Sequence, residues 1–188
     1  MKSKNCEFLD APVTGSKLQA AAGELNFLVG GESATLEKAR PVLEAMSRSI
    51  VSLGPVGSGA LVKLINNFVC GVQVVALAEG IAMIERAGLD RDKAVEVLAN
   101  GAPGSPLVKA LSTRMTTPDY TPNFRLTLMA KDLACAINES KKLSLDLTTG
   151  QTALKSFQNS IAAGDGDKDI AAVVEPLRSA AGKASSGN

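Results

Sequence analysis

The chain has 188 residues, of which 45% are hydrophobic and 21% are charged, and its 20 Lys and Arg residues balance 19 Asp and Glu residues. This length and apolar content suffice for a hydrophobic core and exclude a disordered or fibrous chain. A net charge of +1 provides no long-range field to attract nucleic acid or an anionic membrane surface. We therefore expect neither as a partner.

The sequence contains no histidine. A Ser/His/Asp or Cys/His nucleophile system, a histidine metal ligand and an imidazole proton shuttle are therefore excluded. Acid–base chemistry would fall to Lys, Asp, Glu, Cys or Tyr120. The three cysteines, Cys6, Cys70 and Cys135, lie far apart and outside any CxxC pattern, which predicts small buried thiols and no disulfide or metal site. The first residues lack the apolar run of a secretory signal, so we expect a cytoplasmic location.

The first fifty residues have the pattern of the end of an α/β unit. Short apolar runs predict three strands, at residues 7–9, 24–29 and 49–53. A loop is expected between the first two strands. A helix over 33–46 should join the last two, with Pro41 kinking or splitting it. Strands this short need neighbours, so this region resembles a sheet without its other strands.

After Gly59 the sequence predicts helices only. Of the 25 positions from Ala60 to Ile84 only two are charged, and apolar residues occupy every face, which is typical of a helix buried on all sides. A membrane span is the alternative, but several polar side chains interrupt the run. Helix start and stop signals predict further helices over 90–100, 105–115, 125–142, 147–163 and 167–180. The fold class is therefore mainly α, with a remnant α/β sheet followed by a long buried helix and an all-α bundle.

The densest signal is the glycine loop from Gly54 to Gly59, between the third strand and the long helix. It is not a Walker A loop, because Ala60 and Leu61 stand where Lys and Ser or Thr would be required. It is not a dinucleotide fingerprint, because Val62 replaces the third glycine. The amide groups at the helix start could still receive a substrate carboxylate, and an anion-binding fragment is one alternative for the whole chain.

Lys63 and Asn67 lie one turn apart in the long helix, on the same side. The positive end of the helix dipole, together with burial, disfavours the charged form of a lysine at this position. An amine and a neutral amide so placed can move a proton on and off a substrate oxygen. From these residues alone, a solvent-facing lysine and a structural asparagine are the simpler alternative.

Four motifs occur in this order: Asp10–Ser16 (DAPVTGS), Gly57–Asn67 (GSGALVKLINN), Phe124 followed by Lys131-Asp132-Leu133, and Gly164–Asp169 (GDGDKD) with Val173-Val174-Glu175. This arrangement resembles the β-hydroxyacid dehydrogenase family. That family includes 3-hydroxyisobutyrate dehydrogenases, tartronate semialdehyde reductases and glyoxylate/succinic semialdehyde reductases. The resemblance covers nearly the whole chain but only the later part of a family member. It implies an NAD(P)-dependent oxidoreductase of small hydroxyacids that here lacks its amino-terminal dinucleotide-binding half.

The resemblance also implies roles for individual residues. Lys63 would be the catalytic lysine, acting as general acid when a carbonyl is reduced and as general base when an alcohol is oxidised. Asn67 would orient the substrate, a small aldehyde or alcohol that bears a carboxylate. Thr14, Gly15 and Ser16 would bind that carboxylate. Thr14 stands where many family members have serine. Ser16 and Lys17 resemble the semialdehyde and glyoxylate reductases, but they do not identify the substrate.

Phe124, Lys131 and Asp132 resemble the family's residues on the cofactor side, near the nicotinamide half of NAD or NADP. Lys131 follows Phe124 by two helical turns, so both could face one cleft. From the residues alone, a solvated charge pair on a surface helix is the alternative. The residues that would choose between NAD and NADP belong to the half that is absent from this chain.

The resemblance divides the chain into three regions. Residues 1–56 would be the C-terminal part of a Rossmann-type α/β domain, and 57–180 would be the helical dehydrogenase domain with its long interdomain helix. Residues 181–188 would be a flexible tail. We expect a homo-oligomer, and a non-enzymatic helical dimerisation module is the alternative to an enzyme.

Overall fold

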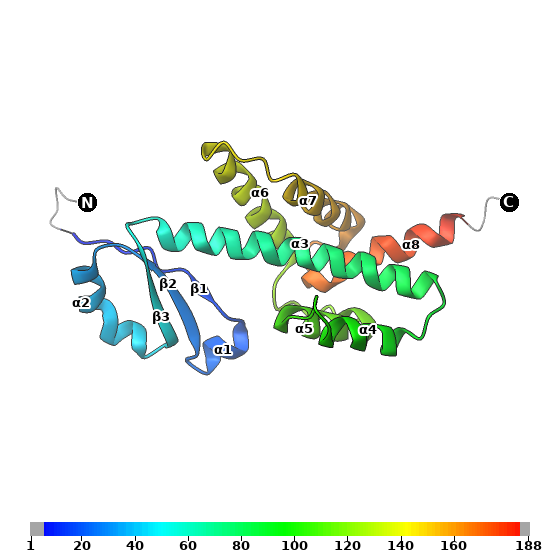
Figure 1. Cartoon of the computed structure of the whole chain (residues 1–188), viewed down its shortest axis with the longest axis horizontal. Helices are drawn as coiled ribbons and strands as arrows, with labels where there is room; N and C mark the ends of the chain where they lie inside the picture. Colours follow the sequence, from blue (N-terminus) through cyan, green and yellow to red (C-terminus); the bar gives the residue numbers. More distant parts are fainter. Residues whose placement is uncertain (1–5, 185–188) are drawn as a thin grey trace. The chain divides into compact units, whose positions relative to one another are not determined.

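The computed structural model describes residues 6–184, with side chains up to residue 179 (Figure 1). It divides the chain into two compact units, Met1–Asn66 and Asn67–Asn188. The division falls inside one long helix, α3, so each unit contains part of it. The two units are described separately below.

The first unit is a small sheet with two helices, α1 and α2. Its elements are β1 (Val13–Thr14), α1 (Lys17–Ala21), β2 (Leu25–Gly30), α2 (Ser33–Glu44) and β3 (Ser47–Gly54). The strand order is β1-β2-β3, with β1 antiparallel to β2 and β2 parallel to β3. Because α2 connects the two parallel strands, these three elements form a βαβ unit. Phe27, Val29 and Leu36 form its buried core.

The sheet differs from the sequence prediction at three places. Residues 7–9 are not a strand; the pairing begins with a single bridge at Asp10, and β1 follows at Val13. The short helix α1 lies in the predicted loop, because Ser16 and Gln19 form a capping box that starts it. Pro41 does not split α2. It is exposed, so the carbonyl group that loses its hydrogen bond can turn toward water.

The second unit is a helical bundle. Its elements are the later part of α3 (Ser58–Arg86), α4 (Arg91–Asn100), α5 (Pro106–Thr116), α6 (Leu126–Lys142), α7 (Thr148–Ser160), a π-helical turn (Ile161–Asp165), a 3-10 helix (Ile170–Val174) and α8 (Glu175–Ala184). In Figure 1, α6 and α7 lie side by side, as do α4 and α5. The predicted start signals are confirmed: Asp90 and Ser105 accept backbone N–H groups at the starts of α4 and α5. Val74, Ile81 and Phe157 are fully buried in the core.

The end of the chain differs from the single predicted helix over 167–180. A 3-10 helix comes first, and α8 begins at Glu175. Pro176 has no N–H group to continue the preceding helix, but it is well suited to the first turn of a new one. α8 runs to Ala184, into the segment expected to be a tail, and residues 185–188 lie outside the described part.

The prediction that the long helix is buried on every side was wrong. Val74 and Ile81 of α3 are fully buried, but Ile65, Val69 and Met83 are 51%, 54% and 72% exposed. Among the described residues, α3 is also the one helix long and apolar enough to cross a membrane, with a mean hydropathy of 1.7 over its most apolar window. A core helix of a soluble protein passes the same test by length and composition.

The cysteines also differ from the prediction of buried thiols. Cys6 and Cys135 are exposed, and Cys70 is half-buried. Cys135 lies one turn after the exposed Lys131 on α6, which places it on the outer side of that helix.

Candidate active site

The glycine loop is a tight turn between β3 and α3. Gly54 and Gly57 have φ angles of +129° and +100°, in the left-handed region that favours glycine. Gly59, in the first turn of α3, lies against β2: a Cβ atom there would be 2.1 Å from the carbonyl oxygen of Leu28. The backbone of the turn therefore favours glycine at Gly54 and Gly57, and the packing of α3 on β2 requires Gly59, so none of the three needs a bound phosphate to explain it.

A carboxylate of the chain itself occupies the amide groups of this turn. The backbone N–H groups of Gly57 and Ala60 donate to the two Asp10 oxygens at 2.6 and 2.7 Å. Burial acts to raise the pKa of Asp10, but these backbone hydrogen bonds outweigh it and hold the pKa below its ordinary value. A substrate carboxylate at these two amides would therefore have to displace Asp10.

Lys63 lies in the second turn of α3 and is half-buried. Asn67, four residues later on the same helix, is only 6% exposed. Residues four apart on a continuous helix lie on the same side, one turn from each other. Because α3 is continuous over both residues, the amine and the amide lie on one side of the helix, as the sequence predicted.

The loop predicted to bind a carboxylate follows β1. Thr14 ends the strand, and Gly15 has a φ angle of +124°, with Leu25 so close that a Cβ atom would lie 3.0 Å from its Cδ2. The backbone N–H group of Ser16 donates to Gln19 Oε1 at 2.9 Å, and its hydroxyl donates to the same oxygen. A substrate carboxylate at Ser16 would therefore have to replace the side-chain oxygen of Gln19.

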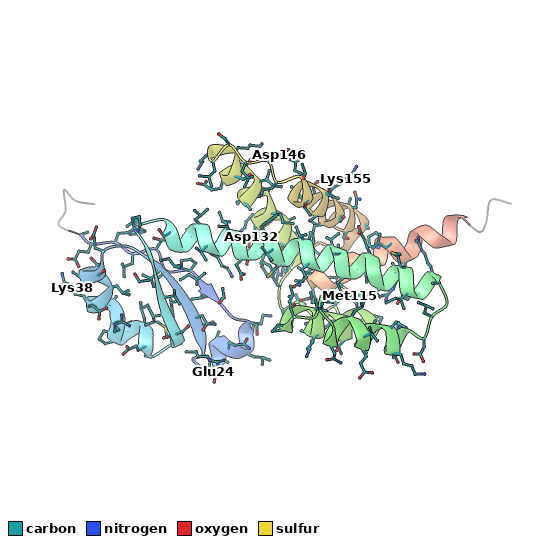
Figure 2. The ribbon with its side chains drawn as sticks, in the orientation of Figure 1. Glu24, Lys38, Met115, Asp132, Asp146 and Lys155 are labelled. Carbon is teal, nitrogen blue, oxygen red and sulfur yellow. The ribbon has the colours of Figure 1, made fainter. Side chains whose placement is uncertain are left out.

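Asn67, Lys131 and Asp132 form one cluster between α3 and α6. Asn67 Nδ2 donates to Asp132 Oδ2 at 2.6 Å, and Lys131 Nζ lies 2.8 Å from Asp132 Oδ1. Figure 2 labels Asp132 beside α3. Its side chain is 13% exposed and that of Lys131 is 64% exposed. The hydrogen bond to Asp132 raises the pKa of Lys131. The two residues are therefore more than a solvated surface pair, because one carboxylate oxygen faces inward.

Phe124 is held by a residue that sequence reasoning assigned no role. Its backbone N–H group and that of Asn123 donate to Asp169 Oδ2 at 3.1 and 2.8 Å. Asp169 is 1% exposed, and Arg114 Nε lies 3.6 Å from its other oxygen. Its motif was noticed, but nothing in the sequence shows that a carboxylate reaches back to a loop more than forty residues earlier. Phe124 is thus fixed just before α6 through Asp169.

The residues present fit one part of a dinucleotide and not another. The glycine turn does not suit a pyrophosphate, because Asp10 already accepts hydrogen bonds from its amide groups. Lys131 suits an anionic group, since its ammonium reaches solvent, and the partly buried Phe124 offers an apolar surface. Within residues 6–184, no group of three or more His, Cys, Asp or Glu side chains could hold a metal ion.

Two family models match the chain. Residues 57–177 match the family described as NAD-binding of NADP-dependent 3-hydroxyisobutyrate dehydrogenase, and residues 1–54 match the NAD binding domain of 6-phosphogluconate dehydrogenase. The chain belongs to the β-hydroxyacid dehydrogenase family. This confirms the family predicted from the motifs, and both descriptions confirm NAD(P) as the cofactor of that family.

Individual relatives agree with the family. The chain is 34% identical over 180 residues to glyoxylate/succinic semialdehyde reductase 2 of Arabidopsis thaliana, covering 96% of this chain and 50% of that protein. It is 34% identical to L-threonate dehydrogenase of Escherichia coli, covering 90% of this chain and 56% of that protein. It thus spans about half the length of these relatives.

Solved structures confirm the fold class. The 3-hydroxyisobutyrate dehydrogenase of Salmonella typhimurium matches with a TM-score of 0.85 and 31% identity, covering 93% of this chain and 61% of that one. The 3-hydroxyisobutyrate dehydrogenase of Mycobacterium tuberculosis, solved with L-serine, matches with a TM-score of 0.83 and 34% identity, covering 90% and 60%. The mainly helical chain with a remnant sheet therefore has the fold of about three fifths of such a protein.

Proposed function

We propose that this chain is the substrate-binding and catalytic part of an NAD(P)-dependent oxidoreductase that interconverts a small β-hydroxyacid and its semialdehyde. The observation that carries the proposal is the pair on α3: Lys63, followed one turn later by Asn67, whose amide is fixed by Asp132. An amine beside an oriented amide is suited to proton exchange with a substrate oxygen.

In this proposal Lys63 is the general acid and base. It donates a proton to the substrate oxygen when a carbonyl is reduced and removes that proton when the alcohol is oxidised. Asn67, whose Nδ2 donates to Asp132 Oδ2, orients the substrate oxygen in this proposal. NAD(P), when bound, supplies or accepts the hydride.

The remaining residues hold the two ligands. Thr14 and Gly15, with Ser16 after release from Gln19, bind the substrate carboxylate through a hydroxyl and backbone amides. The cofactor, NAD or NADP, would be held by residues of the helical unit: Phe124, Lys131 and Asp132. The Phe124 ring would pack against the cofactor, and the ammonium of Lys131 would pair with one of its anionic groups.

We assign the substrate to a class. Relatives are named for glyoxylate and succinic semialdehyde, for L-threonate and for 3-hydroxyisobutyrate. All are small carboxylates, as is the L-serine in the mycobacterial structure. The candidates for this chain are therefore glyoxylate, succinic semialdehyde, tartronate semialdehyde and the 3-hydroxyisobutyrate pair. Since these are water-soluble metabolites, we propose a soluble cytoplasmic enzyme.

We also propose a homo-oligomer, for which α3 is the support. Ile65, Val69 and Met83 are exposed apolar side chains on this helix, and a second copy would remove them from water. The same observation favours the second candidate function, a non-enzymatic helical dimerisation module. Light scattering showing a stable dimer, with no binding of NAD(P) by calorimetry, would favour the module over the enzyme.

The test of the enzyme is turnover. The 188-residue chain and the full protein encoded by its gene are mixed with NADH or NADPH and each candidate aldehyde, and absorbance of the reduced cofactor is followed. We expect Lys63→Ala to lower kcat of the active form by about 10²–10⁴-fold. Lys38→Ala, a lysine in the same unit that pairs with Glu7 on the surface, is the matched control and should leave kcat unchanged. Normal turnover by Lys63→Ala would refute the role of Lys63.

A further inference from the structure

Asp10 connects three parts of the α/β unit that lie next to the proposed catalytic lysine in the sequence or the fold. Its backbone forms a bridge with Gly30 at the end of β2, with N–H···O distances of 3.0 and 2.8 Å. Its side chain accepts the N–H groups of Gly57 and Ala60 at the start of α3. One residue thus holds a strand end, the glycine turn and the first turn of the helix together.

The surroundings of the carboxylate form a socket of fixed size. A Cβ atom at Gly30 would lie 2.3 Å from Asp10 Oδ1 and 2.9 Å from the backbone nitrogen of Ser58. A Cβ atom at Gly59 would lie 3.0 Å from Asp10 Oδ2. Two positions without side chains therefore leave the space that the carboxylate fills, and any larger residue at either would expel it.

The source of this cap is unusual. A helix is normally capped by the residue just before it, but here that residue is Gly57, which has no side chain. The carboxylate comes instead from 47 residues earlier in the sequence. A local cap would stabilise α3 equally well but would not tie it to any strand. The distant cap ties the helix to the segment that continues into Thr14.

We propose that Asp10 is a positioning residue: its carboxylate holds the first turn of α3, and with it Lys63, in place relative to the loop that begins at Thr14. Ala60, which donates to Asp10, precedes Lys63 by less than one turn, and Asp10 precedes Thr14 by four residues. This inference rests on the proposed function for the meaning of Lys63, but the socket itself does not.

The first experiment removes the Asp10 carboxylate and replaces it with formate from solution. Asp10→Gly should lower the Tm of the 188-residue chain by about 3–6 °C, since it removes two charge-assisted hydrogen bonds. Added sodium formate should restore most of this loss in the variant and leave the unmodified chain unchanged. Formamide, or sodium chloride at the same ionic strength, should not. Asp90→Gly is the control. It removes the exposed carboxylate that caps α4 by accepting the backbone N–H group of Lys93 at 3.2 Å, and formate should not rescue it.

The second experiment reads Lys63 directly. Protein grown with lysine that carries ¹³C at Cε gives one NMR signal per lysine, and Lys63→Arg identifies the one of interest. In Asp10→Gly we expect the Lys63 signal to shift or broaden and to return with formate, while that of Lys38 stays in place.

Each outcome decides one part of the proposal. A Tm loss with an unmoved Lys63 signal would overturn the positioning role and leave a structural cap only. A variant that formate rescues in neither measurement would overturn the socket. Absence of turnover in every substrate and cofactor assay would refute the proposed function while leaving the formate and NMR results as they are, so the two failures can be told apart.

Discussion

Asp10 and Asp169 perform the same local task in different surroundings. Each accepts backbone N–H groups from a turn that precedes a helix carrying candidate site residues, α3 for Asp10 and α6 for Asp169. Asp169 is 1% exposed and has Arg114 nearby at 3.6 Å, whereas Asp10 is half-buried and its donors are neutral amides. A carboxylate in a core needs a cation and full hydrogen bonding, whereas one at an edge keeps contact with water. We infer that Asp169 belongs to the framework of its unit and Asp10 to its fine placement.

The largest effect should follow from Asp169→Ala. The substitution leaves the N–H groups of Asn123, Phe124 and Ala171 without their acceptor and removes the more buried of the two carboxylates near Arg114. We expect a loss of about 3–5 kcal/mol in the free energy of unfolding, measured with urea. Asp169→Asn keeps an acceptor and should lose less. If Asp169→Ala were no more harmful than Asp10→Asn, the distinction between the two carboxylates would be wrong.

Asp132→Ala tests an intermediate case. It removes the acceptor of the Asn67 amide, which is 6% exposed, so we expect a loss of about 1–3 kcal/mol. Asp132→Asn can still accept from Asn67 through its amide oxygen and should recover most of that loss while losing the attraction to Lys131. Equal losses in both variants would mean that the charge on Asp132, and not its contact with Asn67, matters for stability.

The fold was predictable where its signals are local. Caps at Asp90 and Ser105 mark the starts of their helices, and the apolar runs before and after α2 mark the parallel strands. Burial of α3 was not predictable, because an apolar helix does not show from its sequence which side is covered in the folded unit. Ile65 and Val69 are exposed although their side chains are apolar.

The candidate site divides in the same way. The spacing of Lys63 and Asn67 on one helix is local information, but only the resemblance to the family predicted roles for them. The contact of Asn67 with Asp132 joins residues 65 positions apart, and no sequence pattern in either segment predicts it. Asp10 belongs to a motif of the sequence, but the amides that it accepts from lie in a glycine turn more than forty residues later. Long-range hydrogen bonds to backbone groups leave no residue pattern at the donor, so sequence reasoning cannot find them.

The pH dependence of stability sharpens the role of Asp10. Its pKa in the folded chain is held below the ordinary value, so its hydrogen bonds stabilise the fold fully above that ordinary value. As pH falls through the lowered folded pKa, this contribution is lost. Asp10→Asn should therefore cost about 1 kcal/mol at pH 7 and close to nothing in strong acid. Urea unfolding of both proteins at several pH values measures the difference, and a constant difference at every pH would contradict it.

The smallest effect on stability should come from Lys131→Ala, although the same carboxylate is involved as in Asp132→Ala. Asp132 has an inner oxygen bonded to Asn67 and an outer one paired with Lys131, whose side chain is 64% exposed. An ion pair that water reaches contributes little, so we expect a change below about 0.5 kcal/mol. If Lys131 pairs with an anionic group of NAD(P), the loss should appear instead as weaker cofactor binding by calorimetry. Lys142→Ala, which removes a comparable exposed pair with Glu139 on the same helix, should change neither quantity. Equal cofactor binding by the Lys131 and Lys142 variants would remove Lys131 from the proposed cofactor site.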